Sequence, residues 1–427
     1  MHRLFQLATS CRVCIHALYL IFGVILIIWL AAGLQAGPSG VYLFLIYDVA
    51  TDSNRLYFIL SFVPAFAAGF SIIGYTLKLP RVDFFSRIIA INIVTYSFLG
   101  LGLSTLRLPL VSREVFIYEF LLSIVLLVGY YLLRNKLFPP HAGVVDDSDI
   151  EAIRRHPALN AEKTTIDVAA FNNFDVVILN LRQNLSPQET HLLTDLAQKR
   201  IPVHDTNAFI ERIWGRIPLN DLTTAEIETF TPPPVYKNVK RLGELALILF
   251  FAPLLALFAV VIAIAIRLDS HGPALFHQLR TGYRGENFTM LKFRSMVFNH
   301  GGGGLLVETS DKRITRVGRV LRRFRLDELP QVWNVLRGEM SLIGPRPEQE
   351  KLSGRFSQLI PFYGFRHTVP PGISGWAQVM YGYTVTDEQT RGKLEFDFYY
   401  IKHMSAWLDF VILLKTLRTI ILGSGVR

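Results

Sequence analysis

The sequence predicts an α-helical membrane protein that carries α/β domains. Three observations predict it: apolar runs of membrane-span length near the N-terminus, a central alternation of strand-like and helix-like patterns, and a basic C-terminal half with an acid pair beside a Gly-Pro-Arg-Pro turn. Hydrophobic residues make up 51% of the 427 residues, and the formal net charge is +10. An apolar and basic chain is typical of a protein at an anionic membrane surface with anionic substrates, so we expect no nucleic acid partner.

Four apolar runs form the predicted transmembrane anchor, a four-helix bundle over residues 1–140. They are Ile15–Gly33, Leu56–Leu77, Ile88–Leu106 and Val115–Leu133. Each is near the roughly 20 residues that cross the hydrocarbon core. Basic residues concentrate before the first run, between the second and third, and after the fourth, which places those segments in the cytoplasm. No run carries an acid cluster, so an anchor is favoured over a transporter. The lone pair Cys11 and Cys14 is expected to carry no chemistry.

Residues 141–235 are predicted to form a linker and a small Rossmann-like cytoplasmic domain. Pro139, Pro140 and the acidic run Asp146–Glu151 indicate the linker. The strand and helix patterns that follow are typical of a parallel sheet with crossover helices. The predicted strands are Ile166–Ala170, Asp175–Asn180 and Ile201–His204, and the predicted helices are Gln188–Lys199 and Asn207–Trp214. No G-x-G-x-x-G loop is present, so a regulatory or structural role is favoured over nucleotide binding.

Leu245–Ile266 is a further apolar run, long enough to cross a membrane. Basic residues flank it on both sides, and Pro253 interrupts it where a missing amide kinks a helix. A crossing would also place the acid pair outside the cell, away from nucleotides. We therefore expect a re-entrant hairpin at about residues 242–267, which keeps a monotopic α/β domain, residues 236–427, in the cytoplasm.

The stretch RLDELPQVWNVLRGEMSLIGPRPE, residues 325–348, holds the main functional signal. Adjacent carboxylates such as Asp327 and Glu328 can bind a divalent metal or act as a nucleophile, and both interpretations stay open at this point. Arg346 suits phosphate because its planar guanidinium donates two parallel hydrogen bonds. The stretch therefore predicts phosphate chemistry.

A predicted strand before the acid pair carries two more basic residues. Lys292 and Arg294 are two positions apart, so their side chains are expected to share one face of the strand. Farther along, Phe396–Leu422 alternates aromatic, aliphatic and charged residues and predicts an amphipathic helix on the membrane. Trp376 and Trp407 fit either the headgroup level or the protein core.

The C-terminal part, from about Tyr236, resembles the bacterial sugar transferase family, the monotopic phosphoglycosyl transferases. The resemblance rests on GPALFHQLRTGYRGENFTMLKFRSM, RITRVGRVLRRFRLDELPQVWNVLRGEMSLIGPRPE and VPPGISGWAQV, which occur in the family's order. With its anchor and middle segment, the chain is similar to the large-form members, the polyprenyl-phosphate glycosylphosphotransferases of exopolysaccharide, capsule or O-antigen initiation.

The resemblance implies an activity and a location. Such enzymes transfer a sugar-1-phosphate from a UDP-sugar to undecaprenyl phosphate and release UMP. They are multi-pass proteins of the bacterial inner membrane whose catalytic domain faces the cytoplasm. Glucose and galactose are the leading sugars, with nothing in the sequence to decide between them, and a homodimer is compatible. The alternative is a catalytically inactive scaffold or regulator, which would be expected to have a damaged acid pair or basic turn.

The resemblance also assigns roles to single residues. Asp327 is the nucleophile and Glu328 its partner, and the two hold Mg²⁺. Arg346, between Pro345 and Pro347, lies in the phosphate-binding turn. The remaining assigned positions are the basic residues Arg280, Lys292 and Arg294 beside the site and Pro253 at the break of the re-entrant helix. Arg325 stands where family members often carry a small polar residue.

Overall fold

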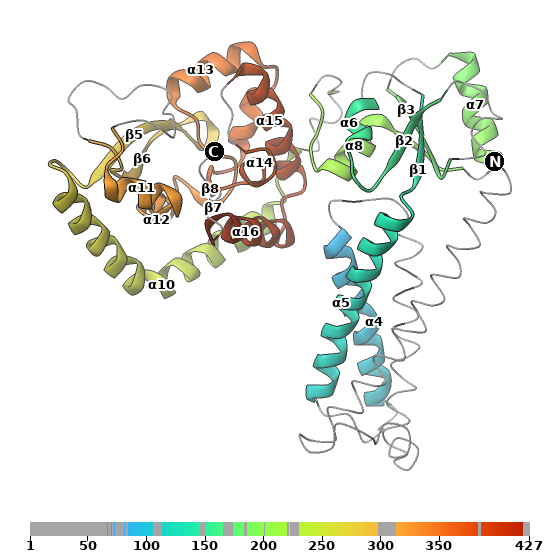
Figure 1. Ribbon diagram of the computed structural model, residues 1–427, viewed down its shortest axis with the longest axis horizontal. Helices are drawn as coiled ribbons and strands as arrows, with labels where there is room; N and C mark the ends of the chain where they lie inside the picture. Colours follow the sequence, from blue (N-terminus) through green and yellow to red (C-terminus); the bar gives the residue numbers. More distant parts are fainter. Residues whose placement is uncertain are drawn as a thin grey trace. The chain divides into compact units, whose positions relative to one another are not determined.

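The computed structural model describes residues 66, 70, 72, 81, 84–105, 113–145, 150–164, 174–182, 186–199, 201–219, 222, 230–297, 313–382 and 386–421. The chain divides into two compact units, Met1–Trp214 and Gly215–Arg427 (Figure 1). Each unit has its own helices, strands and buried core.

The first unit contains two long apolar helices, α4 (Phe84–Thr105) and α5 (Arg113–Leu137). They pack through a buried cluster that includes Ile88 and Leu127, and the Ser123 hydroxyl donates a 3.1 Å hydrogen bond to Asn92 Oδ1 between them. These helices match the third and fourth predicted runs. The run Ile15–Gly33 lies outside the described residues, and only three positions of Leu56–Leu77 are described. The four-helix anchor therefore stays a prediction.

The first unit also contains a four-stranded parallel sheet of order β2-β1-β3-β4. Val176 and Ile178 of β3 pack into one cluster with residues of α8, whereas Val177 packs with Leu192 of α7. Because neighbouring side chains of a strand point to opposite faces, helices cover both faces of this sheet. The elements are β1 (His141–Val144), α6 (Ile150–Arg154), β2 (Asn160–Lys163), β3 (Val176–Leu179), α7 (Pro187–Gln198), β4 (Val203–Asp205) and α8 (Thr206–Trp214).

Most elements predicted for this segment are confirmed, and one assignment is wrong. β3, α7, β4 and α8 lie where strands and helices were expected, whereas Ile166–Ala170 lies outside the described residues. The expected linker instead contains β1 and α6. The strand was missed because β1 is buried on both faces, so the short stretch HAGV shows no alternation of polar and apolar residues.

The second unit surrounds two small sheets with helices. β5 and β6 form an antiparallel hairpin, and β7 pairs in parallel with β8. The elements are α10 (Pro234–Asp269), β5 (Leu275–Thr281), η3 (Tyr283–Gly285), β6 (Asn287–Phe293), α11 (Arg316–Arg323), η4 (Leu326–Glu328), α12 (Gln331–Arg337), β7 (Ser341–Ile343), α13 (Glu350–Leu359), η5 (Tyr363–Thr368), β8 (Gly372–Ser374), α14 (Trp376–Met380), α15 (Asp387–Lys402) and α16 (Ala406–Ile421).

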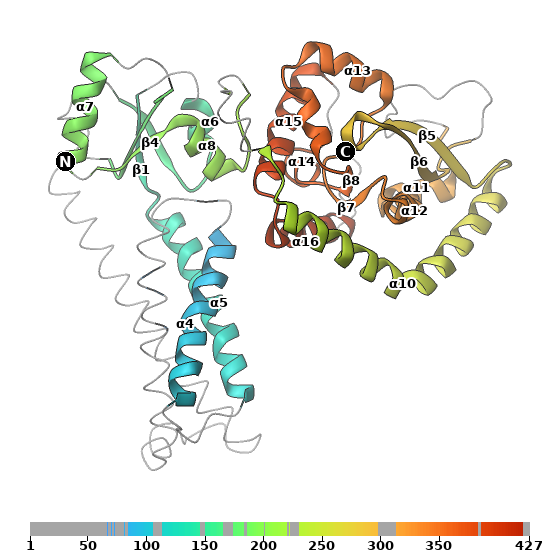
Figure 2. The ribbon, with the colours of Figure 1, turned by 180° about the vertical axis from the view of Figure 1, so that it is seen from behind.

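Helix α10 is the one helix among the described residues that is long and apolar enough to cross a membrane. The expected helix–break–helix is replaced by one helix that runs through Pro253. Figure 2 shows this helix curved, with both ends against the rest of the second unit. Its first part bonds β7 through Lys240, and near its end Ile266 packs against Phe293 of β6. A proline inside a helix removes one hydrogen bond and bends the axis, while the flanking turns stay helical.

The predicted C-terminal amphipathic helix is in fact two helices. α15 ends at Lys402 and α16 begins at Ala406. The reason is local, since the Ser405 hydroxyl accepts a 3.3 Å hydrogen bond from the amide of Leu408 and so caps a new helix. Trp376 belongs to the core: it is 2% exposed, and its indole N–H donates to the carbonyl of Gly215 at 2.7 Å.

Candidate functional site

The acid pair lies in a tight turn between α11 and α12. η4 begins directly after Arg325, whose φ of 52° is in the left-handed region that non-glycine residues rarely adopt. In such a turn adjacent side chains diverge. Glu328 is therefore buried, at 7% exposure, whereas Asp327 is half-buried. The two carboxylates, neighbours in sequence, have different surroundings.

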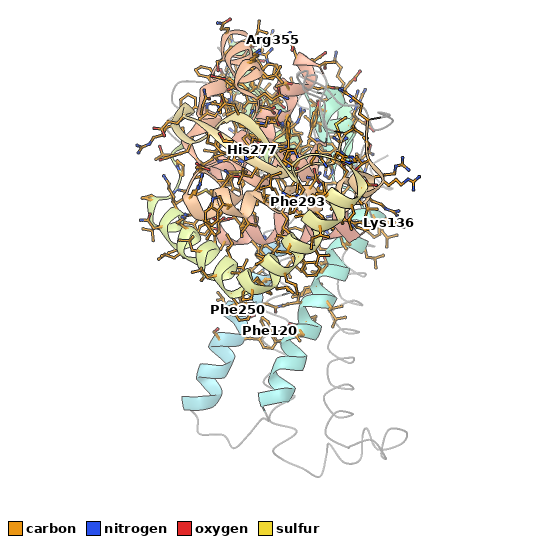
Figure 3. The ribbon with its side chains drawn as sticks, turned by 90° about the vertical axis from the view of Figure 1, so that its left-hand side faces the viewer. Phe120, Lys136, Phe250, His277, Phe293 and Arg355 are labelled. Atoms are coloured by element: carbon orange, nitrogen blue, oxygen red, sulfur yellow. The ribbon has the colours of Figure 1, made fainter. Side chains whose placement is uncertain are left out.

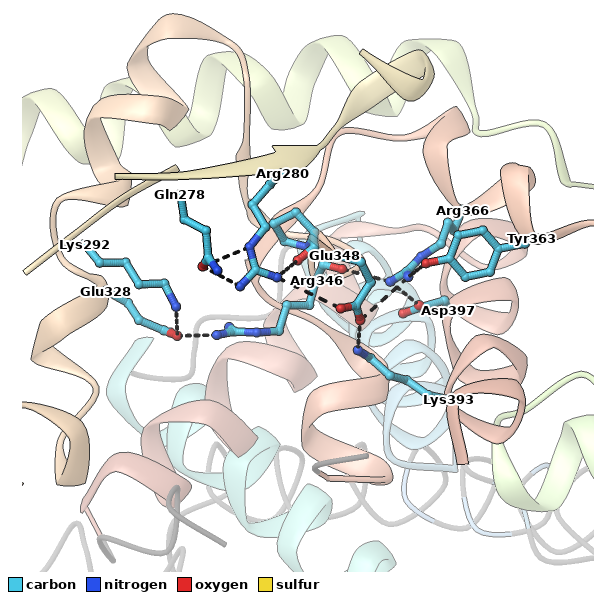
Figure 4. Close-up of polar contacts among 11 residues, drawn as sticks. Gln278, Arg280, Lys292, Glu328, Arg346, Glu348, Tyr363, Arg366, Lys393 and Asp397 are labelled. Atoms are coloured by element: carbon cyan, nitrogen blue, oxygen red, sulfur yellow. Dashed lines mark hydrogen bonds and ion pairs between the residues drawn. The ribbon is translucent and has the colours of Figure 1, made fainter. Parts of the chain in front are cut away.

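Glu328 is held by basic side chains. Its Oε1 accepts a 2.6 Å hydrogen bond from Nη2 of Arg346 and lies 3.9 Å from Nζ of Lys292 (Figure 4). Its Oε2 lies 3.9 Å from Nη1 of Arg325. Burial alone would raise the pKa of Glu328, but the charges of Arg346 and Lys292 outweigh it and lower that pKa. Glu328 is thus an anion across the physiological range.

Asp327 differs from Glu328 both in its partners and in the direction of its pKa shift. Within the described part of the chain it makes neither a hydrogen bond nor an ion pair, although Lys292, Arg346 and Arg322 are near enough to act on its charge. Burial, followed by the negative charge of Glu328, raises the pKa of Asp327. Opposite shifts in neighbouring carboxylates mark a division of roles. Glu328 orders the basic groups, and Asp327 is left with a free carboxylate beside them.

Lys292 comes to the site from the last part of β6. Its side chain is 17% exposed, and burial, followed by the charge of Arg346, lowers the pKa of Lys292 to about 8. Arg346 is 27% exposed on its side chain, and its guanidinium has further N–H groups besides the one that reaches Glu328. Two cations therefore lie beside a carboxylate that no described residue binds, an arrangement suited to a phosphate group.

The Gly-Pro-Arg-Pro turn is packed tightly behind Arg346. Gly344 follows β7 directly, and a side chain there would lie 2.5 Å from the carbonyl of Pro370 in the neighbouring segment. Only glycine allows this close approach of two backbones. Pro345 and Pro347 are both buried. Their rings lock φ at two positions of the turn and remove two amide donors.

Two predicted binding residues serve the surroundings of the site rather than its centre. Arg280 donates from Nη1 to the carbonyl of Pro347 at 2.9 Å and so supports the turn. Arg294 lies outside the cluster, and the expectation that it joins Lys292 beside the acid pair is wrong. β6 ends at Phe293, and Arg294 instead donates 2.6 Å hydrogen bonds to the carbonyls of Ser270 and His271 after α10. The end of a helix leaves carbonyls without partners, which a buried guanidinium satisfies.

The donor set at the acid pair fits a magnesium ion that shares its coordination with substrate. Among the described residues no group of three or more His, Cys, Asp or Glu side chains could enclose a metal. Glu328 is already neutralised by Arg346, and Asp327 keeps its oxygens free of hydrogen bonds within that part of the chain. Mg²⁺ commonly takes one or two carboxylates together with substrate phosphates and waters. The acid pair can therefore supply part of the ligand set of Mg²⁺, and a substrate phosphate would have to supply the rest.

A second set of charged groups behind the turn was not predicted from the sequence. Arg366, Lys393 and Asp397, with Glu348, form a buried network of ion pairs (Figure 4). The available signal was weak: basic and acidic residues among aromatic ones in FYGFRHTV and GKLEFDFYY. Buried charges are rarely left unpaired, so their presence in apolar segments hints at partners elsewhere.

Fold and site together define a protein with a cluster of basic side chains around an acid pair, on a domain that carries an exposed apolar helix. Residues 235–423 match the bacterial sugar transferase family. The chain is 37% identical over 324 residues, 75% of this chain and 76% of the relative, to a UDP-N-acetylgalactosamine-undecaprenyl-phosphate N-acetylgalactosaminephosphotransferase of Aeromonas hydrophila. The chain belongs to the bacterial sugar transferase family and is an enzyme of the transferase class.

Two further relatives match about half of this chain. An undecaprenyl-phosphate glucose phosphotransferase of Komagataeibacter xylinus is 44% identical over 51% of this chain and 40% of its own length. A UDP-glucose:undecaprenyl-phosphate glucose-1-phosphate transferase of Escherichia coli is 40% identical over 43% of this chain and 40% of its own length. The names of these relatives differ in the sugar and share undecaprenyl phosphate.

Proposed function

We propose that the protein transfers a sugar-1-phosphate from a UDP-sugar to undecaprenyl phosphate, with undecaprenyl-diphosphate-sugar and UMP as products. This is the first membrane step in the assembly of an exopolysaccharide, capsule or O-antigen. The observation that carries the proposal is the carboxylate of Asp327, which has no hydrogen bond or ion pair with any described residue and lies beside the cations Lys292 and Arg346. The names of the relatives support the substrate pair.

The proposed reaction has two displacements at one phosphorus. A carboxylate oxygen of Asp327 attacks the phosphorus that bears the sugar, the bond to the bridging oxygen breaks, and UMP leaves. A phosphate oxygen of the lipid then attacks the same phosphorus and releases Asp327. Lys292 and Arg346 donate hydrogen bonds to the phosphoryl oxygens, whose negative charge grows in each step. Glu328 contributes by holding Arg346 in place at 2.6 Å.

Mg²⁺ belongs to the proposal as a cofactor held by Asp327 and Glu328. When bound, it would lessen the charge repulsion between the carboxylates and the diphosphate of the donor. The residues of the chain bind and orient the donor with Lys292 and Arg346, which supply positive charge from the protein side.

We further propose that α10 dips into one leaflet of the membrane and returns. A straight helix of 36 residues would be about 54 Å long, more than the roughly 30 Å hydrocarbon core. Its middle is exposed, with Leu249 64%, Phe250 78% and Leu257 63% accessible, and Figure 3 shows Phe250 at the bend, on the far side of α10 from Phe293. Both ends nevertheless bind the same compact unit, through Lys240 and Asp269. Crossing would divide that unit between two sides of the bilayer.

Labelling from one side of the membrane tests this topology. Val235 and Leu268, at the two ends of α10, are 75% and 83% exposed. Single cysteines at these positions, in a chain with Cys11 and Cys14 replaced by serine, should both react with an impermeant maleimide from the cytoplasmic side of inverted vesicles. Reaction of the two ends from opposite sides would refute re-entry. Reaction of both ends from the cytoplasmic side would also place the domain in the cytoplasm, as the basic residues of the N-terminal loops predict.

The proposed activity is tested with the full-length protein in nanodiscs that contain undecaprenyl phosphate. UDP-N-acetylgalactosamine, UDP-glucose and UDP-galactose are supplied separately, and UMP release and labelled lipid are measured. We expect one donor to be strongly preferred. If no donor in a broad panel yields UMP, the enzyme proposal fails and a scaffold or regulator becomes the better interpretation. The molar mass of the detergent-solubilised protein tests the homodimer that the family resemblance allows.

A further inference from the structure

Basic side chains from three separate elements hold the backbone of the Gly-Pro-Arg-Pro turn and of the residue directly before it. Lys240 of α10 donates from Nζ to the carbonyl of Ile343 at 2.6 Å, and Arg280 of β5 reaches the carbonyl of Pro347 at 2.9 Å. Between them, Nη2 of Arg366 in η5 donates to the carbonyl of Arg346 itself at 2.8 Å. Arg366 and Arg280 thus each fix one carbonyl of the turn, and Lys240 fixes the carbonyl directly before it.

Arg366 is the most deeply buried of these three. It is 4% exposed, its Nη1 donates to the Tyr363 hydroxyl at 2.7 Å, and its Nη2 also donates to Oδ2 of Asp397 at 3.0 Å. Glu348, just after the turn, lies 3.8 Å from Nη1. A buried charge is costly unless it is paired and fully hydrogen-bonded. Arg366 meets that condition and directs one donor at the backbone of the residue that binds Glu328.

The second basic residue of the network holds the other end of the turn. Nζ of Lys393 donates to Oε1 of Glu348 at 2.6 Å. Burial alone would raise the pKa of Glu348, but Lys393 and Arg366 outweigh it and lower that pKa to about 2. Glu348 is therefore a stable anion, and Arg366 and Lys393 bind the chain on both sides of Pro347.

These contacts matter because proline has removed the usual supports. Pro345 and Pro347 have no amide hydrogen, so they cannot donate to a neighbouring strand. The direction of the Arg346 side chain then depends on how the carbonyls around it are held. Arg366 touches neither the acid pair nor Lys292 by any contact among the described residues, so its effect on chemistry would pass through Arg346.

We propose that Arg366 is a positioning residue for transfer: through the carbonyl of Arg346 it aims that guanidinium at the phosphate of the donor. The inference rests on the proposed function and extends it to a residue behind the site. Asp397 and Tyr363 in turn hold the guanidinium of Arg366 by hydrogen bonds of 3.0 Å and 2.7 Å.

Arg366→Lys is the direct test, because it keeps the charge and loses the fork that serves three acceptors. We expect the KM for the UDP-sugar to rise and kcat/KM to fall about 10- to 100-fold, as small misplacements of a binding group do. Arg355→Lys is the matched control, since Arg355 is 57% exposed and pairs with Asp387 at the surface. It should leave both constants within about twofold, as surface substitutions do.

A double-mutant cycle separates positioning from general destabilisation. If Arg366 acts through Arg346, adding Arg366→Lys to an Arg346→Lys protein should lower kcat/KM by less than about threefold, because the two residues are coupled. The proposal would be overturned if the loss of kcat/KM in the double variant equalled the product of the losses in the two single variants. An unchanged KM in a folded Arg366→Lys protein would also overturn it. If Arg366→Lys does not fold, Tyr363→Phe decides, with a smaller rise in KM expected and no rise contradicting the inference.

Hydrogen–deuterium exchange supplies a readout that needs no substrate. Peptides over residues 340–350 should exchange faster in Arg366→Lys, or in Tyr363→Phe if that variant is used, and should be unchanged in Arg355→Lys. If the wild type, the Arg366→Lys (or Tyr363→Phe) variant and the Arg355→Lys variant exchange equally over these peptides, Arg366 does not hold the turn. If the wild type releases no UMP from any donor, the proposed function fails, whereas the exchange measurement still decides the role of Arg366 at the turn.

Discussion

Nη2 of Arg346 donates a 2.6 Å hydrogen bond to Oε1 of Glu328, a contact across 18 positions of sequence. It joins the Gly-Pro-Arg-Pro turn to the acid pair and commits one of the two adjacent carboxylates to a cation. The other carboxylate, Asp327, is left half-buried beside Arg346 and Lys292. One carboxylate of the pair therefore orders Arg346, and the other is left for a different role.

Asp327→Asn should abolish UMP release, with a loss of about 10³-fold or more, because an amide cannot attack the phosphorus. The measurement is UMP formation from the preferred UDP-sugar. After an acid quench without lipid, the wild type should also retain sugar label on the protein and the variant should retain none. Full turnover by Asp327→Asn would rule out the covalent mechanism.

Glu328→Gln is the companion substitution and should behave differently. The amide removes the ion pair with Arg346 but leaves Asp327 able to attack, so we expect weaker donor binding and a partial loss of activity, about 10²-fold. Labelling of the protein after the quench should persist at high donor concentration. Complete absence of label at saturating donor would show that the first displacement cannot proceed without Glu328, and would contradict a merely supporting role.

The activity should fall as the pH rises above about 8. The pKa of Lys292 is lowered to about 8, so this residue is charged below that pH and loses its charge above it. If the charge binds the donor phosphate, kcat/KM should show a basic limb near pH 8. Lys292→Arg keeps its charge at higher pH and should move the limb upward. An identical limb in the variant would assign it to another group.

Stability should decrease in acid through Glu348. The pKa of Glu348 is about 2 in the folded protein, below the ordinary value of 4.5, so its contribution is complete above pH 4.5 and is lost as the pH falls towards 2. The shift corresponds to about 3 kcal/mol in the free energy of unfolding. Thermal unfolding between pH 5 and 3 checks it. Glu348→Gln should be less stable at pH 7 and less sensitive to acid, and equal slopes would contradict the assignment.

Two tryptophans should respond differently to truncation. Trp376 is 2% exposed and stacks on Tyr399 at 5.9 Å, so Trp376→Ala should lower the free energy of unfolding by about 3–5 kcal/mol. Trp333, on α12, is 51% exposed, and its cation–π contact with Arg337 contributes less than about 1 kcal/mol. Denaturant unfolding of the two variants compares them, and equal losses would mean that Trp333 is also buried in solution.

Local signals in the sequence predicted the elements that local interactions make. Helix α7 follows Ser186, whose hydroxyl and the Glu189 side chain form a capping box, and the helix lies where the apolar spacing predicted it. The C-terminal stretch failed for the opposite reason. Its aromatic and aliphatic residues continue across the end of α15, and a single serine cap, Ser405, separates α15 from α16.

Arg294 shows why nearness in sequence is a poor guide to a site. It stands two residues from Lys292, yet the strand ends between them and Arg294 turns to the end of α10. The position of each basic residue depends on which carbonyl or carboxylate is left without a partner after the chain folds. That information resides in contacts between distant segments.

The sequence alone determined the family, the acid pair Asp327–Glu328, the basic turn around Arg346 and the apolar length of α10. Each of these depends only on which residue types stand close together in the sequence. Only the tertiary structure decided that Glu328 is ion-paired while Asp327 has no ion pair with any residue that the structure describes, and that Arg366 holds the backbone of Arg346. The physical reason is the same in both cases. Burial makes an unpaired charge costly, and which charges are buried together is set by the packing of segments far apart in the chain.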